Sequence, residues 1–234
     1  MNETISIIIP TLNEANRIGG TIELVIQNAK KLDLIEIIVA DGGSNDQTVS
    51  IVQSLSKVKL IFSEPGRALQ MNAGAAQAQG EILYFLHADS LPPFNFDQTI
   101  RSAFGRSKLA GCFRLKFDHT HPWLQLAGWL TRFNFRFCRG GDQSLYIKKS
   151  LFFGLGGFNP EHKICEDLYF IDKIYDAKSF DVLPDYILTS SRNYRKHGLL
   201  KTQFHFGLIR MMRRLGVSHR FLSRYYSQWF NKPD

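Results

Sequence analysis

Cysteine is scarce in this sequence, and long apolar runs are missing. The 234 residues include three cysteines and no Cys-x-x-Cys pair, so we expect neither a disulfide framework nor a zinc knuckle. The sequence has no apolar run of about 18 residues, which a membrane-spanning helix would need. It opens with Met1-Asn2-Glu3-Thr4 and enters a predicted strand without a basic, hydrophobic leader, so we expect no secretion signal. These absences favour a cytoplasmic protein.

Acidic residues are almost missing from the end of the chain. From residue 190 onward there are ten Lys or Arg residues and one acid, Asp234. This segment therefore carries a net charge of +9, and the first 189 residues carry about −1, for a total of +8. A basic segment can meet anionic lipid, an anionic substrate or nucleic acid, or it can be a solvated helical face. No recognisable nucleic-acid-binding module accompanies the charge, so we do not expect nucleic acid.

The first hundred residues alternate between apolar strands and helices. This alternation predicts an α/β fold with a mostly parallel central sheet that helices cover on both faces. We expect strands at 4–10, 35–41, 58–64 and 81–87, and helices at 14–32, 45–55 and 67–79.

The pattern is looser after Pro93. No internal repeat, low-complexity segment or linker interrupts it, so we predict a single domain over 1–234. We expect a helix near 96–106, a strand at 109–117, an aromatic helix at 122–137, a strand running into a helix at 143–152, a helix at 165–177, extended chain at 180–191, and then two basic amphipathic helices.

Polar turns follow three of the predicted strands, at residues 10–14, 41–44 and 87–89. In a parallel sheet, ligands bind beyond the carboxyl ends of the strands, where the strand order reverses. The first turn has no Gly-x-Gly-x-x-Gly pattern, which disfavours a dinucleotide-binding dehydrogenase.

The second turn contains Asp41 at the end of its strand. Its carboxylate could accept hydrogen bonds from a pyrimidine N–H or a ribose hydroxyl. The alternative is an N-capped turn in which Asp46 complements the helix dipole. We favour ligand binding for Asp41 and the structural role for Ser44 and Asp46.

Five segments, in this order, resemble the inverting glycosyltransferases of family two. The likeness covers roughly residues 4–200. Within that family, the sequence resembles more specifically a bacterial subgroup whose metal motif reads His-Ala-Asp. The segments are IIIPTLNEANRI, IIVADGGSNDQT, GRALQMNAGAAQAQGEILYFLHADS, GGDQSLYIKKSLFFGLGGF and ICEDLYF.

The resemblance implies a GT-A fold with C-terminal amphipathic helices and a nucleoside-diphosphate-sugar donor, UDP- or GDP-linked. It divides the domain into a nucleotide-binding half (1–105), an acceptor-side half (106–190) and basic C-terminal helices (191–234). The nucleotide contacts that it implies are Pro10, Thr11, Asn13, Glu14, Asp41, Arg67, Asn72, Gly74, His87 and Ala88.

The resemblance also implies a divalent cation, Mn²⁺ or Mg²⁺, with Asp89 as its ligand. One carboxylate is enough when phosphates and waters complete the coordination sphere. His197 could complete the metal shell or could be a surface histidine. The imidazole of His87 could contact metal, sugar or only protein.

Glu166 and Asp167 are neighbouring acids at a predicted helix start. Side chains of helix neighbours point about 100° apart, so both cannot face one atom. The resemblance makes Asp167 the general base that takes a proton from the acceptor hydroxyl, while Glu166 orients the acceptor or caps the helix. The alternative is a helix N-terminus whose acids only complement the dipole.

Two further segments match acceptor-side parts of the family. The turn with Gly141, Asp142 and Gln143 would contact substrate, although a plain β-turn is the alternative. Arg192 and Arg195 flank Asn193-Tyr194, where related enzymes have an Arg-Trp element that contacts phosphate. This departure leaves open which residue contacts the phosphate here.

We therefore predict a metal-dependent inverting glycosyltransferase whose unknown acceptor could be lipid-linked. Residues 200–230, basic and aromatic, would meet an anionic membrane at its inner face or pack on the domain. One rival is a nucleotide-binding scaffold without transferase activity. The other is a nucleotidyltransferase, which the missing Gly-rich, Lys-bearing loop after the first strand disfavours.

Overall fold

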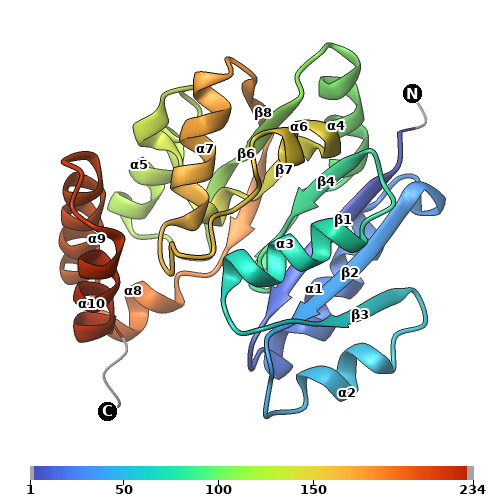
Figure 1. Ribbon diagram of the computed structural model, residues 1–234, viewed down its shortest axis with the longest axis horizontal. Coiled ribbons are helices and arrows are strands. Elements are labelled where there is room, and N and C mark those ends of the chain that lie inside the picture. Colours follow the sequence, from blue (N-terminus) through green and yellow to red (C-terminus); the bar gives the residue numbers. More distant parts are fainter. Residues whose placement is uncertain (1–2, 231–234) are drawn as a thin grey trace.

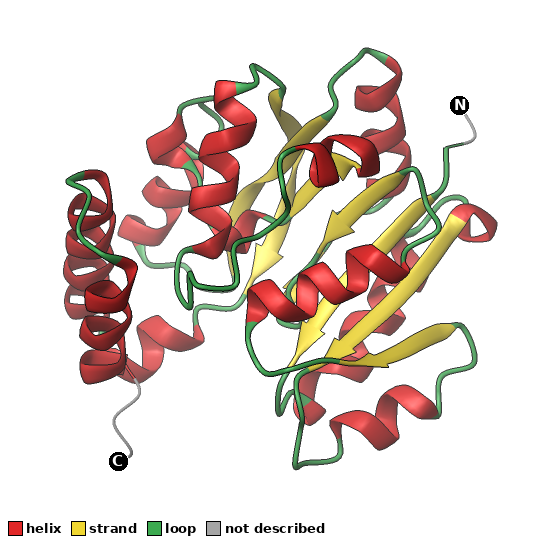
Figure 2. Cartoon of the chain, in the orientation of Figure 1, coloured by secondary structure: helices red, strands yellow, loops and turns green. Residues whose placement is uncertain are grey.

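The computed structural model describes residues 3–230. Its centre is an eight-stranded sheet with the order β3-β2-β1-β4-β7-β6-β8-β5 (Figures 1 and 2). The strands are β1 (Ile5–Thr11), β2 (Ile35–Asp41), β3 (Val58–Phe62), β4 (Ile82–Phe85), β5 (Ser90–Leu91), β6 (Ala110–Phe117), β7 (Leu145–Lys148) and β8 (Phe180–Thr189).

Helices cover both faces of this sheet. The helices are α1 (Ala15–Asn28), α2 (Thr48–Gln53), α3 (Arg67–Gln77), α4 (Phe96–Gly105), α5 (Pro122–Leu130), α6 (Lys149–Gly154), α7 (Glu166–Asp176), α8 (Arg192–His197), α9 (Leu199–Arg214) and α10 (His219–Phe230). Single 3₁₀ turns lie at η1 (Leu32–Leu34), η2 (Arg136–Cys138) and η3 (Gly141–Gln143).

Strand β1 is buried along its whole length because a layer of helices covers each of its sides. Ile5, Ile7 and Ile9 belong to an apolar cluster with side chains of α1, α2 and α4. Ile8 points the other way, into a cluster with α3, α6 and α7. Successive side chains of a strand alternate between faces, so an uninterrupted apolar strand needs both layers. The predicted α/β architecture is confirmed.

The first four strands pair in parallel, and the later strands make the sheet mixed. Strand β7 runs antiparallel to both β4 and β6, and β6 pairs in parallel with β8. The register passes from Phe113 opposite Leu183 to Arg114 opposite Tyr186, so Pro184 and Asp185 form a bulge. Proline suits such a position because it has no N–H to donate to the ladder.

The aromatic helix expected over 122–137 is too long by seven residues, because α5 ends at Leu130. Buried Arg139 is the reason. Its guanidinium donates to the carbonyl oxygens of Thr131 (2.6 Å) and Phe133 (2.5 Å), and weakly to that of Phe135 (3.4 Å). These carbonyl oxygens accept hydrogen bonds from the buried guanidinium and not from the amides of a further helical turn. The chain therefore continues as a loop whose aromatic rings face outward.

The two basic C-terminal helices are confirmed as α9 and α10, which lie side by side (Figure 1). Nδ1 of His205 on α9 lies 2.5 Å from the hydroxyl of Tyr225 on α10, and its ring stacks on Trp229 at 4.3 Å. Phe206 and Phe230 pack at 5.1 Å. Within residues 3–230, no helix has both the length and the apolar character needed to cross a bilayer.

The close packing of α3 on β1 predicts an asymmetry between two helical glycines. A Cβ at Gly74 would lie 2.4 Å from Cγ2 of Ile8, whereas a Cβ at Gly20 in α1 would meet nothing within 4 Å. We expect Gly74→Ala to lower the free energy of unfolding by about 1–3 kcal/mol through overpacking. Gly20→Ala, the matched control, should raise it by about 0.5–1 kcal/mol. Urea unfolding measures both, and equal effects would contradict the packing argument.

Candidate functional site

The His87-Ala88-Asp89 segment forms a tight turn just beyond β4. The backbone N–H of Leu86 donates to the carbonyl oxygen of Ile8 on β1 (3.0 Å). The backbone N–H of Ser90 donates to the carbonyl oxygen of His87 (3.1 Å), which closes the turn. The hydroxyl of Thr21 donates to the carbonyl of Ala88 at 2.6 Å. The turn buries Ala88 and leaves the side chains of His87 and Asp89 half-buried. Both polar side chains therefore lie at the carboxyl edge of the sheet, where ligands bind in such folds.

Arg192 connects this turn to the turn after β1. Its Nη2 lies 3.8 Å from Oδ2 of Asp89 and 3.5 Å from Oε1 of Glu14. Glu14 also pairs with Arg17 at 3.2 Å. Three predicted site residues from distant parts of the sequence thus meet at one place.

A second group of charges surrounds the start of α3. Gly66 has a φ of +141°, a conformation that favours glycine, and it starts the helix at Arg67. Nη1 of Arg67 lies 4.0 Å from Oε1 of Glu166 at the start of α7. The side chain of Arg67 is 62% exposed and that of Glu166 is 3% exposed, so the pair links a surface guanidinium to a buried carboxyl group.

Asp167 lies against the Gly-rich turn of η3. A Cβ on Gly141 would lie 2.0 Å from Oδ2 of Asp167, so only glycine allows this approach. The neighbouring Asp142 is exposed at the rim. The structure thereby brings the predicted base and the predicted acceptor-side turn into contact.

Glu166 and His87 lie in a field of neighbouring charges that shifts the pKa of each. Burial, and then the negative charge of Asp167, raise the pKa of Glu166 to about 7. Desolvation and the positive charge of Arg67 lower the pKa of His87, while Asp142, Asp89 and Asp167 oppose that shift. We name Arg67, His87, Asp89, Asp142, Glu166 and Asp167 the charged cluster.

Tyr226 is a candidate site residue that sequence reasoning missed. Burial raises its pKa, and Arg67, Asp142 and Glu166 all act on the hydroxyl, so α10 places Tyr226 beside the charged cluster. The helix spans from His219, whose ring lies 5.4 Å from that of His162, to Phe230. The only sequence signal for this tyrosine is the amphipathic pattern of α10, which predicts a packed helix face but not a place beside the charged cluster.

Asp41 organises the turns after β1 and β2. Its fully buried carboxylate accepts hydrogen bonds from the amides of Gly43 (2.9 Å) and Ser44 (2.8 Å) and from the hydroxyl of Ser44 (2.5 Å). The hydroxyl of Thr11 donates at 3.3 Å. Asn13 ties the turns together, because its amide donates to the hydroxyl oxygen of Ser44 at 2.9 Å. The predicted ligand role of Asp41 stays a prediction.

Asp46 has the structural role expected of it. Its carboxylate accepts from the amide of Thr48 (2.9 Å) at the start of α2 and from the amide of Ala15 (3.1 Å) at the start of α1. It thereby satisfies N–H groups that have no partner within their own helices.

Two other predicted site residues bind backbone groups of the protein itself. The amide of Asn72 donates to the carbonyl of Phe158 (2.7 Å), and its oxygen accepts from the N–H of Phe158 (3.1 Å). Gln143 donates to the carbonyl of Phe113 (3.3 Å) and accepts from the N–H of Gly140 (3.0 Å). These contacts explain both residues without a ligand, and their predicted binding roles are untested.

Arg195 and His197 also have partners inside the protein. Arg195 pairs with Asp118 at 3.3 Å, and the ring of His197 packs edge-on against Phe230 at 5.3 Å. Across residues 3–230, no group of three or more His, Cys, Asp or Glu side chains is arranged to hold a metal ion.

The sequence profile described as "Glycosyl transferase family 2" matches residues 6–157, more than half of the chain. The chain belongs to glycosyl transferase family 2. Among curated members, the GalNAc(5)-diNAcBac-PP-undecaprenol beta-1,3-glucosyltransferase of Campylobacter jejuni is 38% identical over 92 residues, which cover 36% of this chain and 29% of that enzyme. Four other curated relatives are matched over only 23–34% of their length.

Solved structures of low sequence identity share the fold of this family 2 chain, the GT-A fold. S. aureus TarS 1–349 in complex with UDP-GlcNAc matches with a TM-score of 0.64 and 19% identity, over 80% of this chain and 58% of that one. The mannosyltransferase PcManGT of Pyrobaculum calidifontis, in complex with GDP-Man and Mn²⁺, matches with a TM-score of 0.67 and 18% identity, over 99% of this chain and 65% of that one.

The raised pKa of Glu166 predicts how stability depends on pH. The folded protein holds this proton up to about pH 7, whereas an unfolded chain releases it near 4.5. The free energy of unfolding should therefore fall as pH rises between these two values. Glu166→Gln removes the buried charge, so we expect its melting temperature to exceed that of the wild type by several degrees above pH 7 and the gain to shrink below pH 5.

Glu161→Gln is the control, because Glu161 is an exposed acid a few residues earlier. Differential scanning fluorimetry across pH compares the variants. A Glu166→Gln gain that is the same at every pH would contradict a buried, titrating carboxyl.

Proposed function

We propose that this family 2 protein moves a sugar from a UDP- or GDP-linked donor to an acceptor hydroxyl, with inversion at the anomeric carbon. One observation carries the proposal: the charged cluster places a guanidinium, an imidazole and four carboxyl groups together at the carboxyl edge of the sheet. Such a site can hold a diphosphate on one side and deprotonate a hydroxyl on the other.

The donor nucleoside would occupy the turns after β1 and β2. TarS and PcManGT, which share the fold, are described in complex with UDP-GlcNAc and GDP-Man. We keep Asp41 as the proposed nucleoside contact. A ribose hydroxyl or base N–H would have to replace the hydroxyl of Ser44, which lies 2.5 Å from Oδ1 of Asp41.

We propose Mn²⁺ or Mg²⁺ as cofactor, with Asp89 as the protein ligand. A half-buried carboxylate at the carboxyl edge of the sheet fits this role, since Mg²⁺ is commonly bound by one or two carboxylates together with substrate phosphates. When bound, the cation would neutralise charge on the leaving diphosphate. Arg192, at 3.8 Å from Asp89, would contact the same phosphates, and His197 stays the second proposed ligand.

The chain's own residues would perform the displacement as follows. Arg67 would orient the diphosphate through its planar guanidinium. Asp167 would accept the proton of the acceptor hydroxyl as the oxygen attacks the anomeric carbon, and the bond electrons would leave with the nucleoside diphosphate. Attack opposite the leaving group inverts the anomeric centre. Glu166, with its raised pKa, would orient the acceptor beside Asp167.

We propose that the acceptor is linked to a lipid. The Campylobacter jejuni relative is named for an undecaprenol-linked glycan. The basic helices over 200–230 would then meet an anionic membrane surface, which attracts their exposed arginines. High salt screens this attraction to a range of about 3 Å.

Asp167→Asn tests the general base. The amide keeps the shape of the side chain but cannot accept the proton, so kcat should fall by about 10²–10⁴-fold with little change in donor binding. A screen of UDP- and GDP-sugars, followed by donor turnover, measures this. Asp176→Asn, at the other end of α7, is the control. Unchanged turnover in Asp167→Asn would remove Asp167 from the mechanism.

Asp89→Ala tests the metal ligand by calorimetric titration with UDP and GDP, with and without Mn²⁺. The wild type should bind more tightly with Mn²⁺, and Asp89→Ala should lose most of that gain. The exposed Asp33→Ala variant should keep it. If Asp89→Ala keeps the full gain, the metal is bound elsewhere. Metal-dependent binding by the wild type without turnover of any donor would favour the scaffold rival.

A further inference from the structure

A row of exposed aromatic rings follows the end of α5. Trp129 meets Phe133 edge-on at 5.1 Å, Phe133 lies 6.4 Å from Phe135, and Phe135 stacks on Phe137 at 5.5 Å. Each of these four side chains is 39–56% exposed. We call them the aromatic row. Their mutual packing orders the rings while leaving their outer faces in water.

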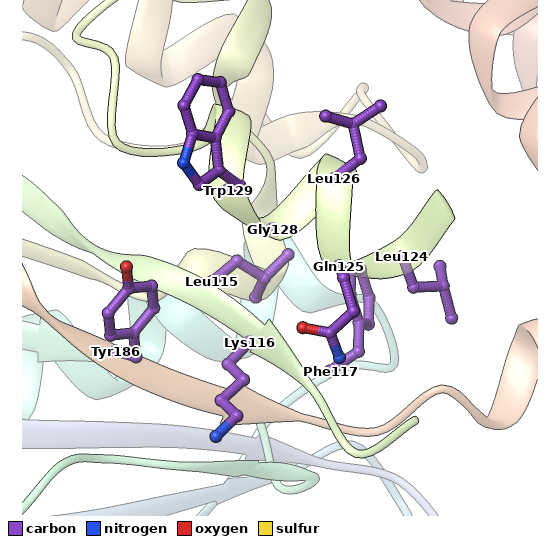
Figure 3. A pocket seen from close by; sticks show the side chains of 9 residues that line it. All are labelled: Leu115, Lys116, Phe117, Leu124, Gln125, Leu126, Gly128, Trp129 and Tyr186. Carbon is purple, nitrogen blue, oxygen red and sulfur yellow. The ribbon is translucent and has the colours of Figure 1, made fainter. Parts of the chain in front are cut away.

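The row begins beside an apolar groove of about 620 Å³. Figure 3 shows Trp129 and Leu126 projecting from α5 above this groove, with Tyr186 and Lys116 across it. Leu126 is itself 47% exposed. The apolar surface therefore extends past Trp129 along α5.

The other end of the row reaches α9. Phe137 lines a second groove, of about 410 Å³, together with Met211 and Leu215. Met211 on α9 and Leu215, which directly follows that helix, are both exposed. Exposed apolar side chains therefore extend from α5 to the end of α9, and clusters of this kind often mark an interaction surface.

Arginines border this surface. The guanidinium of Arg132 lies over the ring of Trp129 at 4.7 Å. Arg136, Arg210 and Arg214 line the second groove beside Phe137.

The acids close to this border already have partners on the protein. Asp176 pairs with Arg136, and Asp172 pairs with Arg213 at 2.6 Å. The uncompensated charge at the edge of the row is therefore positive.

We propose that the aromatic row and the end of α9 form a docking surface for an anionic lipid bilayer. Aromatic rings settle at the level of lipid headgroups, and the arginines beside them can pair with lipid phosphates while their stems stay on apolar surface. Positive charge complements an anionic leaflet. The buried hydrogen bonds of Arg139 keep the loop open, so the rings face outward rather than entering a helix.

The surface adjoins the acceptor side of the site. Arg210 donates weakly to the carbonyl of Phe137 (3.5 Å), and its Nη2 lies 3.2 Å from the position of a Cβ on Gly140. Gly141 and Asp142, next in the chain, belong to the turn that contacts Asp167. Resting on the proposed function, this placement would present the site to an acceptor at the membrane surface.

Flotation with vesicles tests the surface without any donor. Wild-type protein should float with vesicles of phosphatidylcholine and phosphatidylglycerol, and much less with phosphatidylcholine alone or at high salt. Phe135→Ser with Phe137→Ser should weaken binding by about tenfold or more, because both rings lose their place in the interface. Arg214→Glu should weaken flotation at low salt by reversing one positive charge, and this difference from the wild type should disappear at high salt.

Two variants far from this surface serve as matched controls. Phe62→Ser removes an exposed ring on β3, the strand at the opposite edge of the sheet, and Lys57→Glu reverses an exposed charge near it. Both should float like the wild type. Quenching of tryptophan fluorescence by bromine-labelled acyl chains should fall in Trp129→Phe if the row enters the interface.

The proposal is overturned if the wild type does not float, or if Phe62→Ser weakens flotation as much as the paired row variant. It is also overturned if the row variants instead abolish a dimer in analytical ultracentrifugation, since the row would then be a contact between two copies. Donor turnover, measured in solution with the row variants, separates the two proposals. Row variants that lose flotation but keep turnover support the docking surface, whereas a wild type that turns over donor without floating overturns the docking surface alone.

Discussion

The parallel pairing of β1 with β2 and β4 is the constraint on which the rest of the structure depends. Because β1 is the middle strand of the three, the carboxyl ends of all three strands come to one edge of the sheet. The strand order reverses beside β1, so the loops after it and after β4 diverge there. Each of these strands is followed by a polar turn, and the parallel pairing alone brings the three turns together.

Helix packing then supplies the opposing charges. Helices α3 and α7 lie on the same face of the sheet and share an apolar cluster through side chains such as Met71 and Phe170. Each helix begins near the carboxyl edge, so Arg67 and Glu166 meet although about a hundred residues separate them. The interior that holds the helices in place also desolvates Glu166, which is why its carboxyl retains a proton toward neutral pH.

A buried cation shapes the outer half of the molecule in a different way. Burying a guanidinium is costly unless its N–H groups are satisfied. Arg139 meets that requirement with carbonyls of the loop after α5, and it does so at the expense of the helix that the apolar residues there would favour. The exposed aromatic row and the helical hairpin of α9 and α10 border the acceptor side, so the same region combines irregular backbone, positive charge and apolar surface.

Periodicity along the chain was enough to predict the strands of the parallel half, because an uninterrupted apolar run between helices can be buried only in a sheet covered on both faces. The polar turns at residues 41 and 89 could be recognised for the same local reason, and so could the paired acids at residue 166. Only the tertiary structure decided that Arg192 meets Asp89, that Arg139 ends α5, and that Tyr226 joins the charged cluster. Those contacts join residues far apart in the chain, and their geometry depends on how whole helices pack, which no local pattern contains.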